Sequence, residues 1–251
     1  MTKEDLLEKL EEVTDALDGL RDMIESAKKE NEEERSTFCM GLASAAQLLR
    51  AGFGGIFRVG DVIVDVGRTA WTVIGKEMDK DPENPERPTL TLFMRDVLPG
   101  RWQYSNPTPE HRWGHAHWPS STIRKSLNEA FLSGFTEEEQ AAMIAVDKVT
   151  YTVDNEGGKP ETTRDKLFLL SCTEVGIPSG EYIRDEGAAY PYFAGRESRQ
   201  KTDREGTARH WWLRSPNPSY ASDVRYVHSD GSLYYVNAYD GDSAAAACVI
   251  G

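Results

Sequence analysis

The sequence contains few cysteines, no surplus of positive charge and no long apolar run. Its 251 residues include three widely spaced cysteines, Cys39, Cys172 and Cys248, and no C-x-x-C pair, so neither a disulfide framework nor a zinc knuckle is expected. The net charge of −13 argues against binding nucleic acid or an anionic membrane surface, because both require clustered Lys and Arg. The most apolar segment, 38–57, is interrupted by Gln47 and several glycines, so no membrane span is expected.

Motifs of known catalytic sites are also missing. The sequence has no G-x-S-x-G, no H-E-x-x-H and no Walker loop. His111, His115 and His117 have a spacing that a metal ion can use, but they lie in a predicted loop without paired carboxylates, and exposed loop histidines are the simpler interpretation. We therefore expect a binding protein rather than an enzyme, with no metal and no cofactor.

The start of the chain gives two further expectations. No basic segment followed by an apolar one opens the sequence, so we expect synthesis in the cytosol without a signal peptide. Within residues 1–35, apolar residues recur at alternating spacings of four and three, a period that predicts a coiled-coil helix with the seam Leu6, Leu10, Val13, Leu17, Leu20 and Ile24.

A single helix of this length is only marginally stable in water and therefore needs a partner. It either packs on its own globular domain or self-associates. We favour a homo-oligomer, and so few heptads do not separate a dimer from a trimer.

Residues 36–251 are predicted to form one α+β domain. The pattern predicts strands at 61–66, 70–75, 89–93, 148–153, 166–170, 211–214 and 244–250, with hairpins around Gly67-Arg68 and Ser229-Asp230-Gly231. Two helices are expected in the middle of the chain. The first is capped by Ser121 or Thr122, buries Ile123, Leu127, Ala130 and Phe131, and ends at Gly134. The second starts with a Thr136–Glu139 capping box and buries Ala142, Met143 and Val146.

The last 37 residues have an unusual composition. They hold five of the ten tyrosines but no Lys, Glu, Gln, Met, Trp, Thr or Phe. Hairpins and turns favour Tyr, Asp, Ser and Gly, but this does not explain the missing Lys and Thr. Randomising only the adenines of asparagine codons (AAC) gives a set of residues that includes Asn, Ser, Tyr, Asp, His, Val, Ala and Gly and excludes Lys, Glu, Gln, Met and Trp.

Thirteen positions between residues 219 and 242 carry residues from this set. They are Ser219, Tyr220, Ser222, Asp223, Tyr226, His228, Tyr234, Tyr235, Val236, Asn237, Tyr239, Asp240 and Asp242. Their chemistry is that of an antibody paratope, in which Tyr supplies rigid contact area and small polar residues adapt their hydrogen bonds. We expect them to contact a ligand, while Ala221, Val224, Val227, Leu233 and Ala238 between them hold the scaffold.

The sequence resembles a bacterial and phage domain family of unassigned function over roughly residues 59–250. The resemblance rests on W-W-L-R-S-P at 211–216, S-D-G at 229–231, W-T-V-I at 71–74, W-P-S-S at 118–121 and D-K-L-F-L-L-S at 165–171. That family is similar to the C-type-lectin-like fold of formylglycine-generating enzymes and of the variable proteins of diversity-generating retroelements. In those elements an error-prone reverse transcriptase replaces adenines in a template that is copied into the variable gene.

The resemblance implies a variable region at about 217–243, with Trp211, Trp212 and Arg214 supporting the contact surface from beneath. It implies a hypervariable receptor-binding protein or adhesin of a phage tail or a bacterium, whose ligand is a protein or glycan on a target cell. An undiversified interaction module and a formylglycine-type oxidase are the alternatives. The family's closing G-V-R-P segment is missing here, and Cys172 and Cys248 do not reproduce the cysteine pair of the oxidases.

Overall fold

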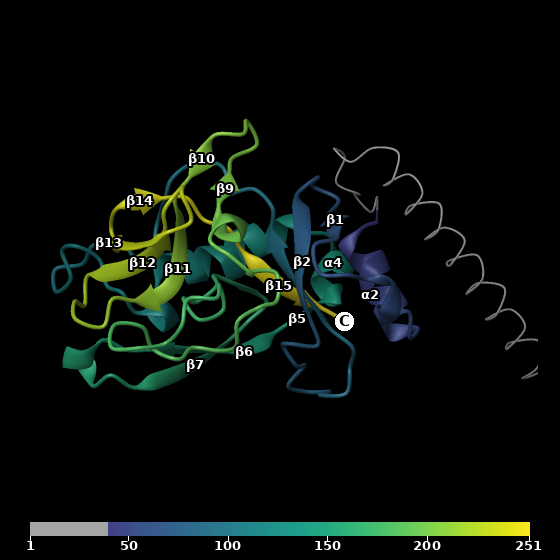
Figure 1. The fold of residues 1–251 in the computed structure, drawn as a ribbon, viewed down its shortest axis with the longest axis horizontal. Helices are drawn as coiled ribbons and strands as arrows, with labels where there is room; N and C mark the ends of the chain where they lie inside the picture. Colours follow the sequence, from purple (N-terminus) through teal and green to yellow (C-terminus); the bar gives the residue numbers. More distant parts are fainter. Residues whose placement is uncertain (1–39) are drawn as a thin grey trace, which may run out of the picture. The chain divides into compact units, whose positions relative to one another are not determined.

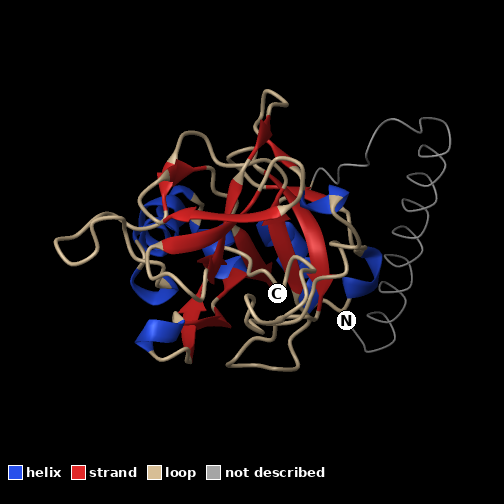
Figure 2. Cartoon of the chain, turned by 60° about the vertical axis from the view of Figure 1, so that its left-hand side comes forward, coloured by secondary structure: helices blue, strands red, loops and turns tan. Residues whose placement is uncertain are grey.

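The computed structural model describes residues 40–251, and it shows a mixed α+β domain with few helices and many short antiparallel strands (Figures 1 and 2). This confirms the predicted α+β class. The coiled-coil prediction and its seam lie outside the described residues. Within the described range, no helix combines the length and the apolar character that crossing a membrane requires.

The central element is a six-stranded antiparallel sheet. Its order is β1-β2-β3-β15-β5, and β8 also pairs with β15. The strands are β1 (Val62–Val64), β2 (Ala70–Lys76), β3 (Leu90–Met94), β5 (Met143–Ile144), β8 (Leu167–Phe168) and β15 (Ala247–Ile250). Every residue of β3 and β15 is buried, as expected for strands inside a sheet with both faces covered.

The predicted hairpin around Gly67-Arg68 is confirmed as the β1–β2 connection, with Ile63 opposite Trp71. Arg68 adopts a positive φ of 62°, and Asp65 fixes the turn by accepting the Thr69 N–H at 2.7 Å. The same carboxylate accepts the Trp71 indole N–H at 3.0 Å. The turn is therefore tied to the buried ring that follows it.

Three α-helices of the described part of the chain accompany the sheet: α2 (Leu42–Arg50), α3 (Thr122–Ser126) and α4 (Glu137–Ala142). Ser121 caps α3, which continues through a π-helical turn, Leu127–Phe131. The predicted Thr136–Glu139 capping box at the start of α4 is confirmed.

Two details of the helix predictions are wrong. Ala130 is exposed, because the chain widens into the π-helical turn and that position rotates away from the core. The second helix ends at Ala142, and Met143 and Val146 are buried as strand residues instead. The helix ends earlier than its apolar spacing predicts, because Met143 and Ile144 form β5 and pair with β15 directly after Ala142. Val146 then begins β6 (Val146–Tyr151), which pairs with β7 (Pro160–Asp165).

A separate three-stranded sheet, β11-β12-β13, contains six of the thirteen predicted contact positions, and most of the others lie in the turns next to its strands. Its strands are β11 (Trp211–Pro216), β12 (Asp223–Val227) and β13 (Leu233–Asn237). Two small pairs complete the fold, β4 (Trp102–Gln103) with β14 (Gly241–Asp242), and β9 (Lys201–Thr202) with β10 (Ala208–Arg209). Figure 1 shows β11, β12 and β13 together on one side of the drawing, away from β1 and β2.

Candidate functional site

Strand β11 forms the buried floor of the site. All of its residues are buried, and Trp211, Trp212 and Arg214 are fully so. The two indole N–H groups donate to backbone carbonyls, Trp211 to Arg199 at 2.9 Å and Trp212 to Trp102 at 2.7 Å. Each ring thus fills the core while its polar atom is satisfied, as a buried tryptophan requires.

Arg214 is the most thoroughly bonded side chain of this floor. Its guanidinium forms a two-pronged pair with Glu174 at 2.5 and 3.1 Å, and it donates to the carbonyls of Leu169 at 2.9 Å and Glu186 at 2.8 Å. Burial alone would favour the uncharged forms, but the opposite charges override it. The pair raises the pKa of Arg214 above its usual range and lowers the pKa of Glu174 to about 2.

The charged network extends from Glu174 to a second cation. Lys148 Nζ donates to Glu174 at 2.9 Å, to Asp79 at 2.5 Å and to the Tyr190 hydroxyl at 2.8 Å. Glu186 lies beside the network and accepts the Tyr151 N–H at 2.9 Å and the Ser215 hydroxyl. Burial raises the pKa of Glu186 to about 7. The network stabilises the floor without presenting a reactive group to solvent.

The predicted hairpin at Ser229-Asp230-Gly231 is confirmed as the β12–β13 connection, with Tyr226 opposite Tyr234. Asp230 binds the Ser232 N–H at 2.9 Å and pairs with Arg196. Gly231 has a φ of +82°, and a Cβ there would lie 2.2 Å from the Arg196 carbonyl. Only glycine fits this turn against that carbonyl.

None of the thirteen predicted contact positions is buried. Ser219, Tyr220, Tyr234 and Tyr235 are exposed and the other nine are partly exposed. Among the residues predicted to hold the scaffold, Val224, Val227 and Ala238 are fully buried, whereas Ala221 and Leu233 are only partly so.

The thirteen positions do not form one flat patch. Residues directly opposite in an antiparallel pair share a face, and neighbours along a strand point to opposite faces. Tyr226 therefore shares one face with Tyr234, whereas Tyr235 shares the other with Arg225. Tyr235 covers the Arg225 guanidinium at 5.3 Å from the ring centre.

A row of rings marks the Tyr226 face. Tyr226 stacks against His210 with ring centres 5.4 Å apart, and His210 lies 4.1 Å from His228. Tyr234 lies 5.5 Å from His228 and 6.2 Å from Tyr226. The row presents aromatic faces and ring nitrogens side by side, a combination suited to flat or hydroxyl-rich ligands.

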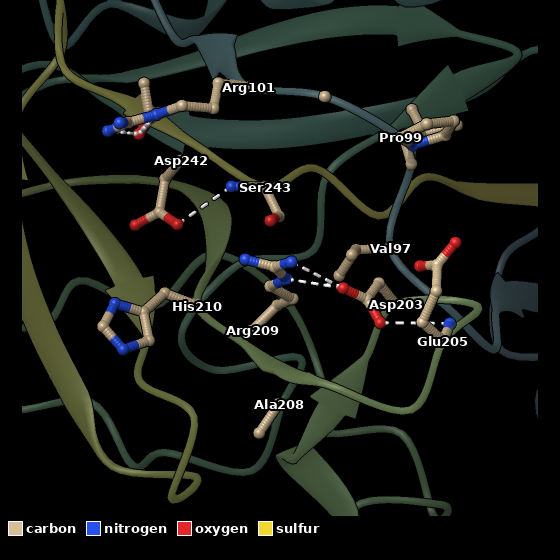
Figure 3. Close-up of a pocket in the computed structure, with 13 residues that line it drawn as sticks. Val97, Pro99, Arg101, Asp203, Glu205, Ala208, Arg209, His210, Asp242 and Ser243 are labelled. Atoms are coloured by element: carbon tan, nitrogen blue, oxygen red, sulfur yellow. Dashed lines mark hydrogen bonds and ion pairs between the residues drawn. The ribbon is translucent and has the colours of Figure 1, made fainter.

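A pocket of about 570 Å³ adjoins this row (Figure 3). In Figure 3, Asp242 and His210 lie at one end, Asp203 and Glu205 at the other, and Arg209 between them. Arg209 pairs with Asp203 at 2.7 Å. Asp242 accepts the Ser243 N–H at 2.9 Å, and burial raises the pKa of its carboxyl. The pocket thus offers a carboxylate and an imidazole beside the tyrosines.

The loop between residues 100 and 119 packs against the segment that follows β13. Tyr239 donates its N–H to the Trp113 carbonyl at 3.1 Å, and their rings lie 5.4 Å apart. Gly114 has a φ of +76°, and a Cβ there would lie 2.7 Å from both the Ser105 carbonyl and the Tyr239 nitrogen. The backbone of this loop therefore packs directly against the segment that follows β13.

The three loop histidines stack on one another. The ring centres of His111 and His115 are 4.1 Å apart, and His115 binds Glu156 at 2.8 Å while His117 binds Glu161 at 2.7 Å. They are partly buried rather than exposed, because β7 and the turn before it supply the carboxylates. Within residues 40–251, no group of His, Cys, Asp or Glu side chains is arranged to hold a metal ion.

Sequence reasoning missed several residues of the site. His210, Trp113 and Arg101 come from outside the variable segment, and Arg101 donates to the Gly241 carbonyl at 2.9 Å. Arg225 lies within the segment but is not one of the thirteen positions. No local pattern identifies these residues, because only the tertiary fold brings them to the hairpin.

The strands that form this site lie within a region that matches a known protein family. Residues 90–250 match the family described as "Domain of unknown function (DUF6273)". The match runs from β3 through β15 and includes the buried floor, the hairpin and the pocket. No curated protein and no solved structure matches the chain. Since the match spans well over half of the sequence, the chain belongs to the DUF6273 family.

Proposed function

We propose that the chain is a non-enzymatic ligand-binding protein with a C-type-lectin-like fold, whose contact surface is built from the thirteen positions between residues 219 and 242. One observation carries the proposal. All thirteen residues are exposed or partly exposed, with Tyr226 and Val236 also packed against the core, whereas Trp211, Trp212 and Arg214 are fully buried. Residues at the thirteen positions can therefore change while the core beneath them stays the same.

The residue types at these positions support diversification by adenine-directed mutagenesis. A retroelement of this kind changes many codons at once, so it needs a surface whose folding does not depend on them. The strand pairing of β12 with β13 uses backbone groups, which any residue except proline supplies. In this proposal the protein is a receptor-binding protein or adhesin of a phage or bacterium, and its ligand is a protein or glycan on a target cell.

An N-terminal coiled coil would strengthen the attachment of such a protein to its target. Oligomerisation presents several copies of the surface to one target cell, so weak single contacts add up to firm attachment. This part of the proposal rests on the heptads of residues 1–35 alone.

The cysteines weigh against the oxidase alternative. That chemistry needs an activated thiolate, which a nearby positive charge or a helix N-terminus favours by lowering the thiol pKa. Cys172 and Cys248 are buried, and burial raises the pKa of Cys172 to about 12 and that of Cys248 above its usual range. Both thiols are therefore protonated at neutral pH.

The first test separates contact residues from core residues. We expect joint Tyr234→Ala, Tyr235→Ala and Tyr239→Ala to leave the free energy of unfolding nearly unchanged in denaturant titrations, because Tyr234 and Tyr235 are 54% and 50% exposed and Tyr239 is partly exposed. The matched control, Trp212→Ala, removes a fully buried ring and should cost about 3–5 kcal/mol. A comparable loss in the triple variant would assign the tyrosines to the core.

The second test addresses diversification and is genomic. We expect a near-copy of the stretch coding for residues 215–250 close to the gene, with asparagine codons at the thirteen positions, beside a reverse-transcriptase gene. Sibling proteins with fixed residues at Tyr234, Tyr235 and Tyr239 would instead favour the undiversified interaction module.

A further inference from the structure

Arg225 occupies an unusual position on the Tyr235 face of the hairpin. It lies on β12 directly opposite Tyr235 and is 8% exposed. Its guanidinium stacks under the Tyr235 ring, with 5.3 Å from the guanidinium carbon to the ring centre. Its Nη2 donates to the Tyr182 carbonyl at 3.0 Å.

Among the described residues, Arg225 has no acidic partner. The Tyr182 carbonyl is the one hydrogen-bond acceptor it finds there, and its Nε is buried without any. A guanidinium carries five N–H donors, and here the Nε–H is buried without an acceptor while Nη2 has a single carbonyl partner. A buried charge without a partner is costly, and proteins normally pair it with an opposite charge.

Arg214, the other buried arginine of residues 40–251, shows how this fold satisfies such a group. It binds both oxygens of Glu174 and the carbonyls of Leu169 and Glu186. Arg214 is fully buried and paired with a carboxylate, whereas Arg225 is 8% exposed and has no carboxylate partner among the described residues. The contrast indicates that the partner of Arg225 comes from outside the domain.

The surroundings of Arg225 define what that partner must be. Tyr235 and Tyr182 are 50% and 57% exposed, so the guanidinium lies just beneath surface aromatic residues. Stacking on a ring leaves the edge of the guanidinium free for a planar, two-pronged interaction with a carboxylate or a phosphate.

We propose that Arg225, held between the Tyr235 ring and the Tyr182 carbonyl, binds an anionic group of the ligand, a carboxylate or a phosphate. The inference rests on the proposed function in one respect, that Tyr235 belongs to the contact surface. Arg225 is not one of the thirteen positions. It is a fixed anion-binding point on a surface whose neighbouring residues change, so different ligands share an acidic group.

The experiment follows the Nε–Hε cross-peak of Arg225, assigned through bonds from the backbone, in ¹H–¹⁵N spectra of the full chain. Phenyl phosphate and benzoate are the anionic probes, and benzamide is the neutral probe of similar shape, all at constant ionic strength. We expect a saturable shift with one or both anions and none with benzamide. The anion that saturates at lower concentration identifies the preferred group.

Two variants complete the design. Arg225→Gln should weaken binding of the anionic probe by about tenfold or more, because a charge-assisted hydrogen-bonded pair is lost. Arg184→Gln, which removes an arginine already paired with Asp154, should bind as the parent does. The proposal is overturned if neither anion gives a saturable shift in the parent protein, or if benzamide gives the same one.

The parent titration needs no variant to fold, so it decides the question by itself. It also separates the two proposals. If the parent protein binds no anion, the anion-site proposal is refuted, and the tyrosine surface is still tested by the triple variant. If sibling proteins carry fixed residues at the thirteen positions, diversification is refuted, and the anion titration is unaffected.

Discussion

At the scale of single residues, the two buried arginines show how the same side chain takes opposite roles. The Arg214 guanidinium donates to the Glu174 carboxylate and to the carbonyls of Leu169 and Glu186, and these bonds tie β11 to the segment 169–186. Arg225 lies beneath the exposed rings of Tyr182 and Tyr235, and its buried Nε–H has no acceptor. The difference comes from Glu174, which reaches Arg214 and not Arg225.

Removing the Arg214 charge should therefore be severe. We expect Arg214→Met to lower the free energy of unfolding by about 3–5 kcal/mol, because Glu174 then loses its main charge partner inside the core. Denaturant titration monitored by tryptophan fluorescence measures the loss. Arg164→Met is the matched control, since its pair with Asp147 is exposed, and it should change little. Equal losses in both variants would contradict a special role for the buried pair.

Glu186 predicts a pH dependence of stability. Burial raises its pKa from 4.5 to about 7 in the folded protein, so the folded state holds this proton more tightly than the unfolded state. The resulting stabilisation is complete below pH 4.5 and is lost as the pH rises through about 7. Glu186→Gln is neutral throughout and should therefore gain stability relative to the parent between these two values.

The measurement is the free energy of unfolding of both proteins at several pH values across that window. Glu174 does not interfere, because its partners lower its pKa to about 2. A difference between parent and variant that is constant with pH would show that Glu186 is ionised throughout.

At the scale of elements, the packing of the 100–119 loop against the variable segment depends on Gly114. We expect Gly114→Ala to destabilise the protein more than Gly100→Ala does. Both glycines have a positive φ, +76° and +83°, so both variants incur the backbone cost of about 1 kcal/mol. A Cβ at residue 114 also meets backbone at 2.7 Å, whereas one at residue 100 meets nothing within 4 Å. The overcrowding should add ~1–3 kcal/mol.

Thermal unfolding of the two variants gives this difference directly. Amide chemical shifts of Trp113 and Tyr239 should move in Gly114→Ala and stay in place in Gly100→Ala. Identical behaviour of the two variants would mean that the loop yields without disturbing the variable segment.

The turns and helix caps were predictable from residues close together in the sequence, whereas features set by long-range strand pairing were not. The β1–β2 turn, the Ser121 cap, the Thr136–Glu139 capping box and the hairpin before Gly231 were predictable, because each depends on residues a few positions apart. The end of the second helix was not. Apolar spacing continues to Val146, but the pairing of β5 with β15 begins directly after Ala142, and β6 follows from Val146.

Strand β7 and the pocket were missed for related reasons. The sequence Pro160–Asp165 is polar and alternates weakly, so its strand character comes from its partner β6. The pocket joins Arg101, Asp203, His210 and Asp242, which are distant in the chain. Of the proposed contact surface, composition predicted the thirteen positions between residues 219 and 242, whereas the neighbouring residues are seen only in the fold.

At the scale of the whole molecule, the heptads predict a homo-oligomer. We expect the full chain to have at least twice the monomer mass in light scattering coupled to size exclusion. Joint Leu10→Lys and Leu17→Lys should give a monomer, because charges on an apolar seam prevent helix pairing. The control, Glu11→Lys and Asp18→Lys, adds the same residues off the seam and should keep the oligomer. A monomeric full chain would contradict the prediction.

The position of β15 determines which altered copies of the protein can fold. This strand pairs with β3, β5 and β8, and it follows the variable segment in the chain. If the segment is rewritten as we propose, a frameshift or stop codon introduced there would also remove the strand at the centre of the main sheet. Such a product would lack part of its core and would be open to proteolysis, whereas an in-frame change of surface residues would leave β15 intact. Folding would then discard faulty copies before they are displayed.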